Sequence, residues 1–301
     1  MQRSADEPAL LRDTMTTMLR ITSAGLLTLL AQPSAAQGAT PDLPTLARQV
    51  GGAHRPDGPT AKVEAFTCQL ELHLLDVSEK NGGQANLDVD FLQQAREAPK
   101  KPRTFIRYKV RGVDRAIRRG FDRFGPWHIQ QGKPADLTAA GAQRDLQSLR
   151  EHTNLARQLL RFLSPEAVIE SLEAPTKVVD DKLRIGRKSA AVYSVSGRLS
   201  EFPLMQRAGS DAPAFVTIYV DKSSKRLLGI DAWPIEDGAS DRARGERILL
   251  SDLQLRDGLL VPRTLRYLWR DAAGKLRSHS TAKIITLDLS PNLDAKHFDR
   301  S

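Results

Sequence analysis

The sequence has few of the residue types from which catalytic and metal centres are built. It holds a single cysteine, Cys68, and six scattered histidines. No H-E-x-x-H or paired-cysteine pattern brings metal ligands together, and no G-x-S-x-G nucleophile elbow occurs. We therefore expect no catalytic residue, no metal ion and no cofactor, and we do not expect an enzyme. Cys68 alternates with apolar residues, which predicts a buried small hydrophobe.

The sequence also lacks an apolar run long enough to span a membrane as a helix, which requires roughly 20 residues. Its longest such segment, Ala24–Leu30, follows Arg20 and precedes the small residues Ser34 and Ala36. A basic residue, a short apolar core and small residues at a cleavage point are the three parts of a secretory signal peptide. We expect residues 1–36 to be this signal.

The start of the signal and its end both bear on where the protein works. Residues 1–17 contain three acidic side chains and differ from a basic signal start, so translation from Met15 or Met18 is the alternative. No cysteine stands at the cleavage point, so we expect no lipid anchor. The sequence predicts an exported, periplasmic protein.

The charge is strongly one-sided, with a formal net charge of +9. Ten of the basic residues lie between Lys100 and Arg123, and on a strand Arg107, Lys109 and Arg111 project to the same side. Such a stripe suits anionic lipid headgroups or an acidic envelope protein, and a solvated outer face is the alternative. Export and an aromatic content of only 5% argue against nucleic acid as the partner.

The chain divides into three parts by composition. After the signal, residues 37–61 are rich in proline and glycine and predict a linker, with a short helix possible at Leu43–Val50. Residues 62–301 form the folded domain. Within it, apolar residues at three- and four-residue intervals predict a helical insertion over 142–172, which includes a second short helix capped by Ser164.

Most of the domain alternates apolar and polar residues with a period of two, which is typical of strands with one buried face. The predicted strands are 62–77, 105–113, 127–130, 189–196, 214–220, 226–232, 247–255, 261–269 and 275–289. Short turns between them favour antiparallel neighbours. We therefore predict a mainly β (α+β) fold, an antiparallel curved sheet whose concave face is covered by the helical insertion. Asp88 and Asp90 fall outside these strands and are interpreted as a solvated edge, with an acid/base pair as the alternative.

Three phrases in the C-terminal third carry a family resemblance. They are VTIYVDKSSKRLLGIDAW, then ERILLSDLQLRDGLLVPRTLRYLWRDAAGKL, then KIITLDLSPNLDAKHFD. This cadence, from about Ala214 to Arg300, resembles the LolA-like superfamily of periplasmic lipoprotein carriers and lipoprotein-sorting proteins. The resemblance implies that the sheet is an open antiparallel half-barrel, which holds acyl chains or another hydrophobic partner under helices.

The resemblance turns the concave face into a candidate binding site. The candidate ligand-binding residues are Phe66, Leu70, Leu72, Ile106, Tyr108, Leu159, Leu160 and Leu163. We expect a soluble binding protein for a lipid, a lipoprotein acyl chain or a similar hydrophobic ligand, and no oligomeric state is predicted. The alternative is an envelope protein-interaction or sensor module that uses the same fold without a lipid ligand.

Overall fold

The structure is a computed structural model of the chain. It describes residues 39–58, 63, 65–75, 84–94, 103–110, 116–122, 125–130, 132–137, 154–205, 212–236, 239–240, 245–270 and 274–292. Residues from Thr40 onward belong to one compact unit. The predicted signal peptide, residues 1–36, lies outside the described residues.

Helix α1 (Leu43–His54) lies within the segment that the sequence predicts as a linker. It begins where the Asp42 carboxylate accepts a hydrogen bond from the Thr45 backbone N–H at 2.9 Å, and a proline stands in its first turn. Its buried residues are Leu46, Ala47, Val50 and His54. Segment 37–61 is therefore not only a linker, because α1 adds an apolar face to the core.

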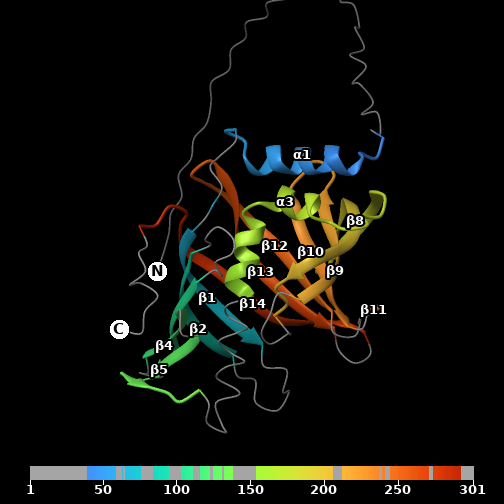
Figure 1. Cartoon of the computed structure of the whole chain (residues 1–301). Coiled ribbons are helices and arrows are strands. Elements are labelled where there is room, and N and C mark those ends of the chain that lie inside the picture. Colours follow the sequence, from blue (N-terminus) through green and yellow to red (C-terminus); the bar gives the residue numbers. More distant parts are fainter. Residues whose placement is uncertain are drawn as a thin grey trace, which may run out of the picture. The chain divides into compact units, whose positions relative to one another are not determined.

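One antiparallel sheet forms most of the described chain (Figure 1). Its first half contains β1 (Ala65–Leu75), β2 (Gln84–Gln94), β3 (Arg103–Val110), β4 (Ala116–Asp122), β5 (Gly125–Gln130) and β6 (Lys133–Pro134). Its second half contains β7 (Val179–Ile185), β8 (Lys188–Phe202), β9 (Ala212–Asp221), β10 (Leu227–Glu236), β12 (Glu246–Arg256), β13 (Leu259–Arg270) and β14 (Leu276–Asp288). The short β11 (Ala239–Ser240) pairs with β10.

The order of the strands leaves the sheet open. Along the sheet they follow β6-β5-β4-β3-β2-β1-β14-β13-β12-β10-β9-β8-β7. The pairing of β1 with β14 joins the two halves, and β6 and β7 are the edge strands. This confirms the predicted fold class, a mainly β protein with an open antiparallel sheet.

Tight turns set the antiparallel register, as their sequences predict. In the turn between β9 and β10, the Asp221 carboxylate accepts hydrogen bonds from the backbone N–H groups of Ser223 and Ser224 at 3.1 and 2.7 Å. Between β12 and β13, Asp257 and Gly258 both adopt positive φ, at 48° and 76°. Two consecutive residues of positive φ match the right-handed twist of the flanking strands.

The sequence prediction misses five of the described strands, which are β2, β4, β6, β7 and β11. Strands β4 and β7 are not predicted, because basic and acidic residues interrupt their apolar alternation. Asp88 and Asp90 lie on β2, which is hydrogen-bonded to β1 on one side and β3 on the other. The predicted position of these residues at a sheet edge is therefore wrong.

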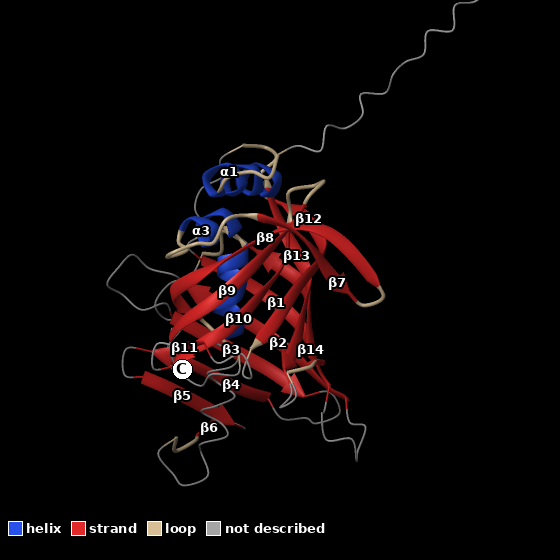
Figure 2. Cartoon of the chain, turned by 90° about the vertical axis from the view of Figure 1, so that its right-hand side faces the viewer, coloured by secondary structure: helices blue, strands red, loops and turns tan. Residues whose placement is uncertain are grey.

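Two helical segments follow the first half of the sheet. Residues 154–162 are helical and, together with Leu163 directly after them, are called the inner helix below. Helix α3 (Pro165–Glu170) begins three residues after residue 162. The N-terminal part of the predicted insertion, residues 142–153, lies outside the described residues. The sequence predicts that the Ser164 side chain caps α3, and this prediction is wrong. The Ser164 hydroxyl oxygen instead accepts a hydrogen bond from Arg55 at 3.1 Å. Figure 2 shows the inner helix within the curve of the sheet.

The buried imidazole of His54 joins α1 to two strands of the sheet. Its Nδ1 donates to the Leu260 carbonyl oxygen at 3.2 Å, and its Nε2 accepts from the Leu227 backbone N–H at 3.1 Å. These partners require the neutral imidazole, with the proton on Nδ1. Burial lowers the pKa of His54 below its ordinary value of 6.5, because it disfavours the charged ring.

We expect this lowered pKa to make the fold less stable in acid. The unfolded chain binds a proton on His54 more readily than the native protein does, so the free energy of unfolding falls as the pH drops below about 6.5. The variant His54→Gln should lose about 1–3 kcal/mol at pH 7.5, because two buried partners lose their bonds. Urea unfolding between pH 7.5 and 5 measures both effects. If the variant kept the full acid dependence of the native chain, His54 would not be its source.

Candidate functional site

The concave face of the sheet is the largest apolar surface inside the described chain. Alternate residues of β1, β8, β9, β10, β12, β13 and β14 face the same side and are buried in one cluster. From the sheet these include Phe66, Leu70, Val195, Val216, Ile218, Ile230, Ile248, Leu250, Leu265, Tyr267, Ala282 and Ile284. Because each of these strands contributes between two and four residues to the cluster, the surface runs across the sheet rather than along one strand.

The inner helix covers this face. Leu155, Leu159, Phe162 and Leu163 are each no more than 2% exposed and belong to the same apolar cluster as the strands. Leu160 is partly buried and packs against the cluster from the side. Their three- and four-residue spacing places one face of the helix against the sheet.

A small set of polar contacts also holds the inner helix. The Asn154 side chain donates to the Leu204 carbonyl oxygen at 2.8 Å. The Gln158 amide donates to the Pro203 carbonyl oxygen at 2.5 Å and to Glu246 Oε1 at 2.8 Å, and Glu246 Oε2 accepts from the Met205 backbone N–H at 2.9 Å. The helix is therefore bound to the sheet through Glu246, the first residue of β12.

Beside Glu246, the concave face carries polar atoms for which the described residues offer no partner. The Tyr267 hydroxyl and the Trp269 indole N–H are both buried without a hydrogen bond in the described part of the chain. Burial, and secondarily the charge of Glu246, raises the pKa of Tyr267 well above 10, so the hydroxyl keeps its proton. This end of the apolar face thus presents two hydrogen-bond donors.

His279 lies at the same end of the sheet. Its ring stacks on Trp269 with the ring centroids 3.3 Å apart, and its Nδ1 lies 3.2 Å from the Ser280 hydroxyl. Burial lowers the pKa of His279 to about 4, so the imidazole is neutral near pH 7. Among the hydrogen bonds described for His279 none involves a carboxylate, and this geometry gives no support to an acid/base role.

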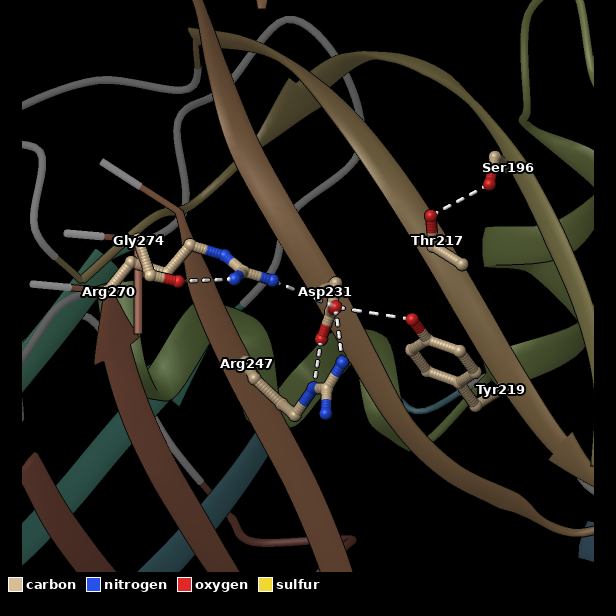
Figure 3. Close-up of polar contacts among 7 residues, drawn as sticks. All are labelled: Ser196, Thr217, Tyr219, Asp231, Arg247, Arg270 and Gly274. Atoms are coloured by element: carbon tan, nitrogen blue, oxygen red, sulfur yellow. Dashed lines mark hydrogen bonds and ion pairs between the residues drawn. The ribbon is translucent and has the colours of Figure 1, made fainter. Parts of the chain in front are cut away.

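The convex face carries a separate polar cluster centred on Asp231 (Figure 3). Arg247 donates to both Asp231 carboxylate oxygens, at 2.5 and 2.6 Å, and Tyr219 donates to Oδ2 at 3.2 Å. Arg270 approaches the same oxygen to 3.7 Å. Asp231 is only 3% exposed, so its charge is balanced inside the cluster rather than by water.

Packing around this cluster is equally close. The Trp233 indole lies so near Gly245 that a Cβ there would approach its Cδ1 to 2.3 Å. Burial, followed by the charge of Asp231, raises the pKa of Tyr219 to about 12. Burial tends to lower the pKa of Arg247, but its bonds to Asp231 raise it overall. Tyr219 therefore keeps its proton and Arg247 its positive charge at neutral pH. The cluster joins β9, β10, β12 and β13.

The structure brings together four of the predicted ligand-binding residues. Phe66, Leu70, Leu159 and Leu163 are buried in the concave cluster, and Leu160 packs against it. Leu72 lies on β1, and Ile106 and Tyr108 lie on β3, but their side chains lie outside the described residues.

The predicted basic stripe lies partly within the described backbone. Arg107 and Lys109 are on β3, directly opposite Asp90 and Asp88 of β2. Residues of opposite charge at such positions are cross-strand neighbours, which stabilise a sheet modestly. Arg111 lies outside the described residues. Contact of this stripe with an anionic partner stays a prediction.

Sequence reasoning missed Glu246, Gln158 and Tyr267 as site residues. A signal for Glu246 was present, since it has the same strand parity as the apolar Ile248 and Leu250, where a charge is unexpected. Gln158 has the helical spacing of Leu155 and Leu159 and could have been noticed for the same reason. Tyr267 carries no such signal, because a tyrosine on a buried face is ordinary.

Two further searches of the described residues bear on the site. No group of three or more metal-binding side chains occurs among the residues that the structure describes. None of the helices in that part of the chain is both long enough and apolar enough to cross a membrane.

We expect Asp231→Asn to destabilise the protein by about 3 kcal/mol, near the lower end of the range for breaking buried ion pairs. The substitution leaves Arg247 and Arg270 without their carboxylate, while both are partly shielded from water. Asp180→Asn is the matched control, because Asp180 is 59% exposed and pairs with Lys222, and such surface pairs contribute about 0–1 kcal/mol. Urea unfolding of the two variants measures the difference, and equal losses would contradict a structural role for the cluster.

Comparisons with known proteins find similarity at the level of structure. No family model matches the sequence, and the search of curated proteins finds no match. One similar structure is a domain assigned to outer membrane lipoprotein sorting from Vibrio parahaemolyticus, with 10% identity and a TM-score of 0.43 over 85% of this chain and 96% of that chain. Another is a LolA superfamily protein from Nitrosomonas europaea, with 10% identity and a TM-score of 0.46 over 86% and 98% of the two chains. The second protein belongs to the superfamily that the C-terminal motifs resemble, and neither similarity assigns a ligand to this chain.

Proposed function

We propose that the protein binds a lipid, a lipoprotein acyl chain or a similar hydrophobic ligand on the concave face of its sheet. The observation that carries this proposal is the cover of that face by the inner helix, whose apolar contacts an acyl chain can replace. The helix is a separate segment above a continuous apolar surface, and the polar contacts described for it go to Pro203, Leu204 and Glu246. A ligand that displaces the helix leaves the strand pairing intact.

The energies of the two covers are similar. Four fully buried side chains of the inner helix contribute roughly 6–12 kcal/mol, at roughly 1.5–3 kcal/mol each. An acyl chain with about 14 methylene groups contributes roughly 11 kcal/mol, at roughly 0.8 kcal/mol per group. The helix and an acyl chain of this length therefore compete for the same surface with similar free energies. A much shorter acyl chain competes weakly.

The same observation keeps the second candidate function open. The inner-helix residues that face the sheet are no more than 2% exposed, so the concave face is already covered without a ligand. An envelope protein-interaction or sensor module with the helix as permanent core fits that packing. In such a module no lipid would be extractable, and the helix would stay in place.

Export to the periplasm belongs to this proposal. It rests on the signal-like pattern of residues 1–36, and removal of that segment leaves α1 and the sheet in place, since they begin after it. A periplasmic location supplies lipoproteins and lipids as ligands. Mass spectrometry of the protein secreted by a Gram-negative host tests the location and the cleavage point, and an intact N-terminus in the cytoplasm would contradict both.

The direct test is extraction of lipids from protein purified from the periplasm, together with native mass spectrometry. We expect a bound mass that organic solvent removes, and uptake of a fluorescent fatty acid by the extracted protein. A ligand-free mass combined with no uptake would overturn the proposal and favour the interaction module.

Ligand affinity should rise with acyl chain length. Each pair of methylene groups removed should weaken binding about tenfold, because it removes roughly 1.6 kcal/mol of apolar burial. Displacement of the fluorescent fatty acid by saturated chains from about six to 16 carbons measures this dependence. Binding that did not depend on chain length would show that the chain does not enter the apolar face.

Movement of the inner helix gives a second prediction. Charged residues at Leu159 and Leu163 are a poor test, because both side chains are at most 2% exposed and such changes would unfold the core. Hydrogen exchange is direct: ligand should accelerate exchange of the amides of residues 154–162 and leave those of β9 unchanged. If the helix amides became more protected with ligand bound, displacement would be wrong.

A further inference from the structure

The side-chain amide of Gln158 is the one polar group of the inner helix that reaches Glu246 in the described contacts. Gln158 is fully buried, and its Nε2 donates to Glu246 Oε1 at 2.8 Å and to the Pro203 carbonyl oxygen at 2.5 Å. Its own oxygen, Oε1, is buried without a partner among the described residues. The Gln158 side chain thus gives Glu246 a hydrogen-bond donor, but its own carbonyl oxygen has no donor among the described residues.

Among the described residues, the sheet beneath the helix has buried hydrogen-bond donors that lack an acceptor, whereas Gln158 has an acceptor that lacks a donor. Tyr267 Oη and Trp269 Nε1 are donors without an acceptor in the described part of the chain, and both are buried. They are two residues apart on β13 and so face the same side, and Trp269 lies directly opposite Glu246 in the register of β12 and β13. An acceptor, Glu246, and two donors therefore lie side by side on one apolar face.

We propose, building on the proposed function, that Glu246, Tyr267 and Trp269 bind an amide group of the ligand. This amide attaches the acyl chain to the rest of the lipid or lipoprotein. The amide N–H donates to Glu246 in place of Gln158, and the amide carbonyl oxygen accepts from both Tyr267 and Trp269 with its two lone pairs. The rest of the acyl chain covers the apolar residues that the inner helix leaves. The Gln158 side chain is the internal substitute for this ligand amide.

Other polar groups fit these three residues less well. An ester has the carbonyl but no N–H, so it cannot replace the hydrogen bond that Gln158 donates to Glu246 Oε1, and loss of a buried hydrogen bond is costly. A free carboxylate adds a second negative charge beside Glu246 in a site of low dielectric. An ammonium group pairs with Glu246 but gives Tyr267 and Trp269 nothing to donate to. Only a group with a donor and an acceptor together meets both requirements.

Three probes of one chain length separate these possibilities. N-methylpalmitamide, methyl palmitate and palmitate are compared by displacement of a fluorescent fatty acid from the full-length mature protein. We expect the amide to bind about tenfold or more tightly than the ester, and the carboxylate to bind no better than the ester.

The variant Tyr267→Phe tests the donor. Since this hydroxyl has no partner in the described structure, its removal should leave thermal unfolding unchanged or slightly raise the midpoint. We expect the variant to lose about five- to tenfold in affinity for both carbonyl-bearing neutral probes. Tyr219→Phe is the matched control, because it removes a tyrosine hydroxyl from the convex face and should leave all three affinities unchanged.

The outcomes distinguish this proposal from the function on which it rests. If the three probes bound the native protein with equal affinity, or if Tyr267→Phe bound them as the native protein does, the amide site would be overturned while lipid binding stood. If no probe bound and no lipid was extracted, the proposed function itself would fail. The site would be supported if the native protein bound the amide most tightly, Tyr267→Phe weakened that binding and Tyr219→Phe left it unchanged.

Discussion

Burial of the inner helix against the concave face of the sheet is the interaction on which the rest of the structure depends. The sheet is open, so its concave side cannot be closed by strand pairing alone and needs a cover. Leu155, Leu159, Phe162 and Leu163 supply it, and their burial joins strands of both halves of the sheet into one core. The interior of the half-barrel is therefore protein core as it stands, and any ligand must compete with the helix for that surface.

Two polar anchors limit how the helices are attached. On the inner helix, Gln158 reaches Glu246 at the start of β12. On α1, His54 bridges Leu227 and Leu260, and Arg55 forms an ion pair with Glu166 of α3. Buried hydrogen bonds of this kind add little net stability each but make alternative positions costly, because every one leaves a polar group without a partner. These hydrogen bonds and the ion pair therefore favour one arrangement of the helices, which apolar contacts alone do not specify because they are non-directional.

The two faces of the same strands have separate tasks. On β9, β10, β12 and β13, one set of residues forms the concave cluster, and the alternate set forms the ion-pair network around Asp231. Because that network fastens neighbouring strands from the outside, the sheet does not depend on the inner helix alone for its integrity. This division is compatible with the proposed exchange of the inner helix for a ligand, which requires the sheet to persist without the helix.

The sequence by itself determined the period of the strands, the antiparallel turns such as Asp221–Lys225 and Asp257–Gly258, and the amphipathic helical segment, because each depends on residues close together in the chain. From these alone, the mainly β class, the antiparallel sheet and the helix on its concave face could be predicted, whereas the open form of the sheet was implied by the family resemblance of the C-terminal motifs. Only the tertiary structure decided that α1 belongs to the core, that Asp88 and Asp90 lie on an interior strand, and that Glu246, Gln158 and Tyr267 meet. Those three residues are as far as 109 positions apart in sequence, and no local pattern encodes which strand lies beside which helix.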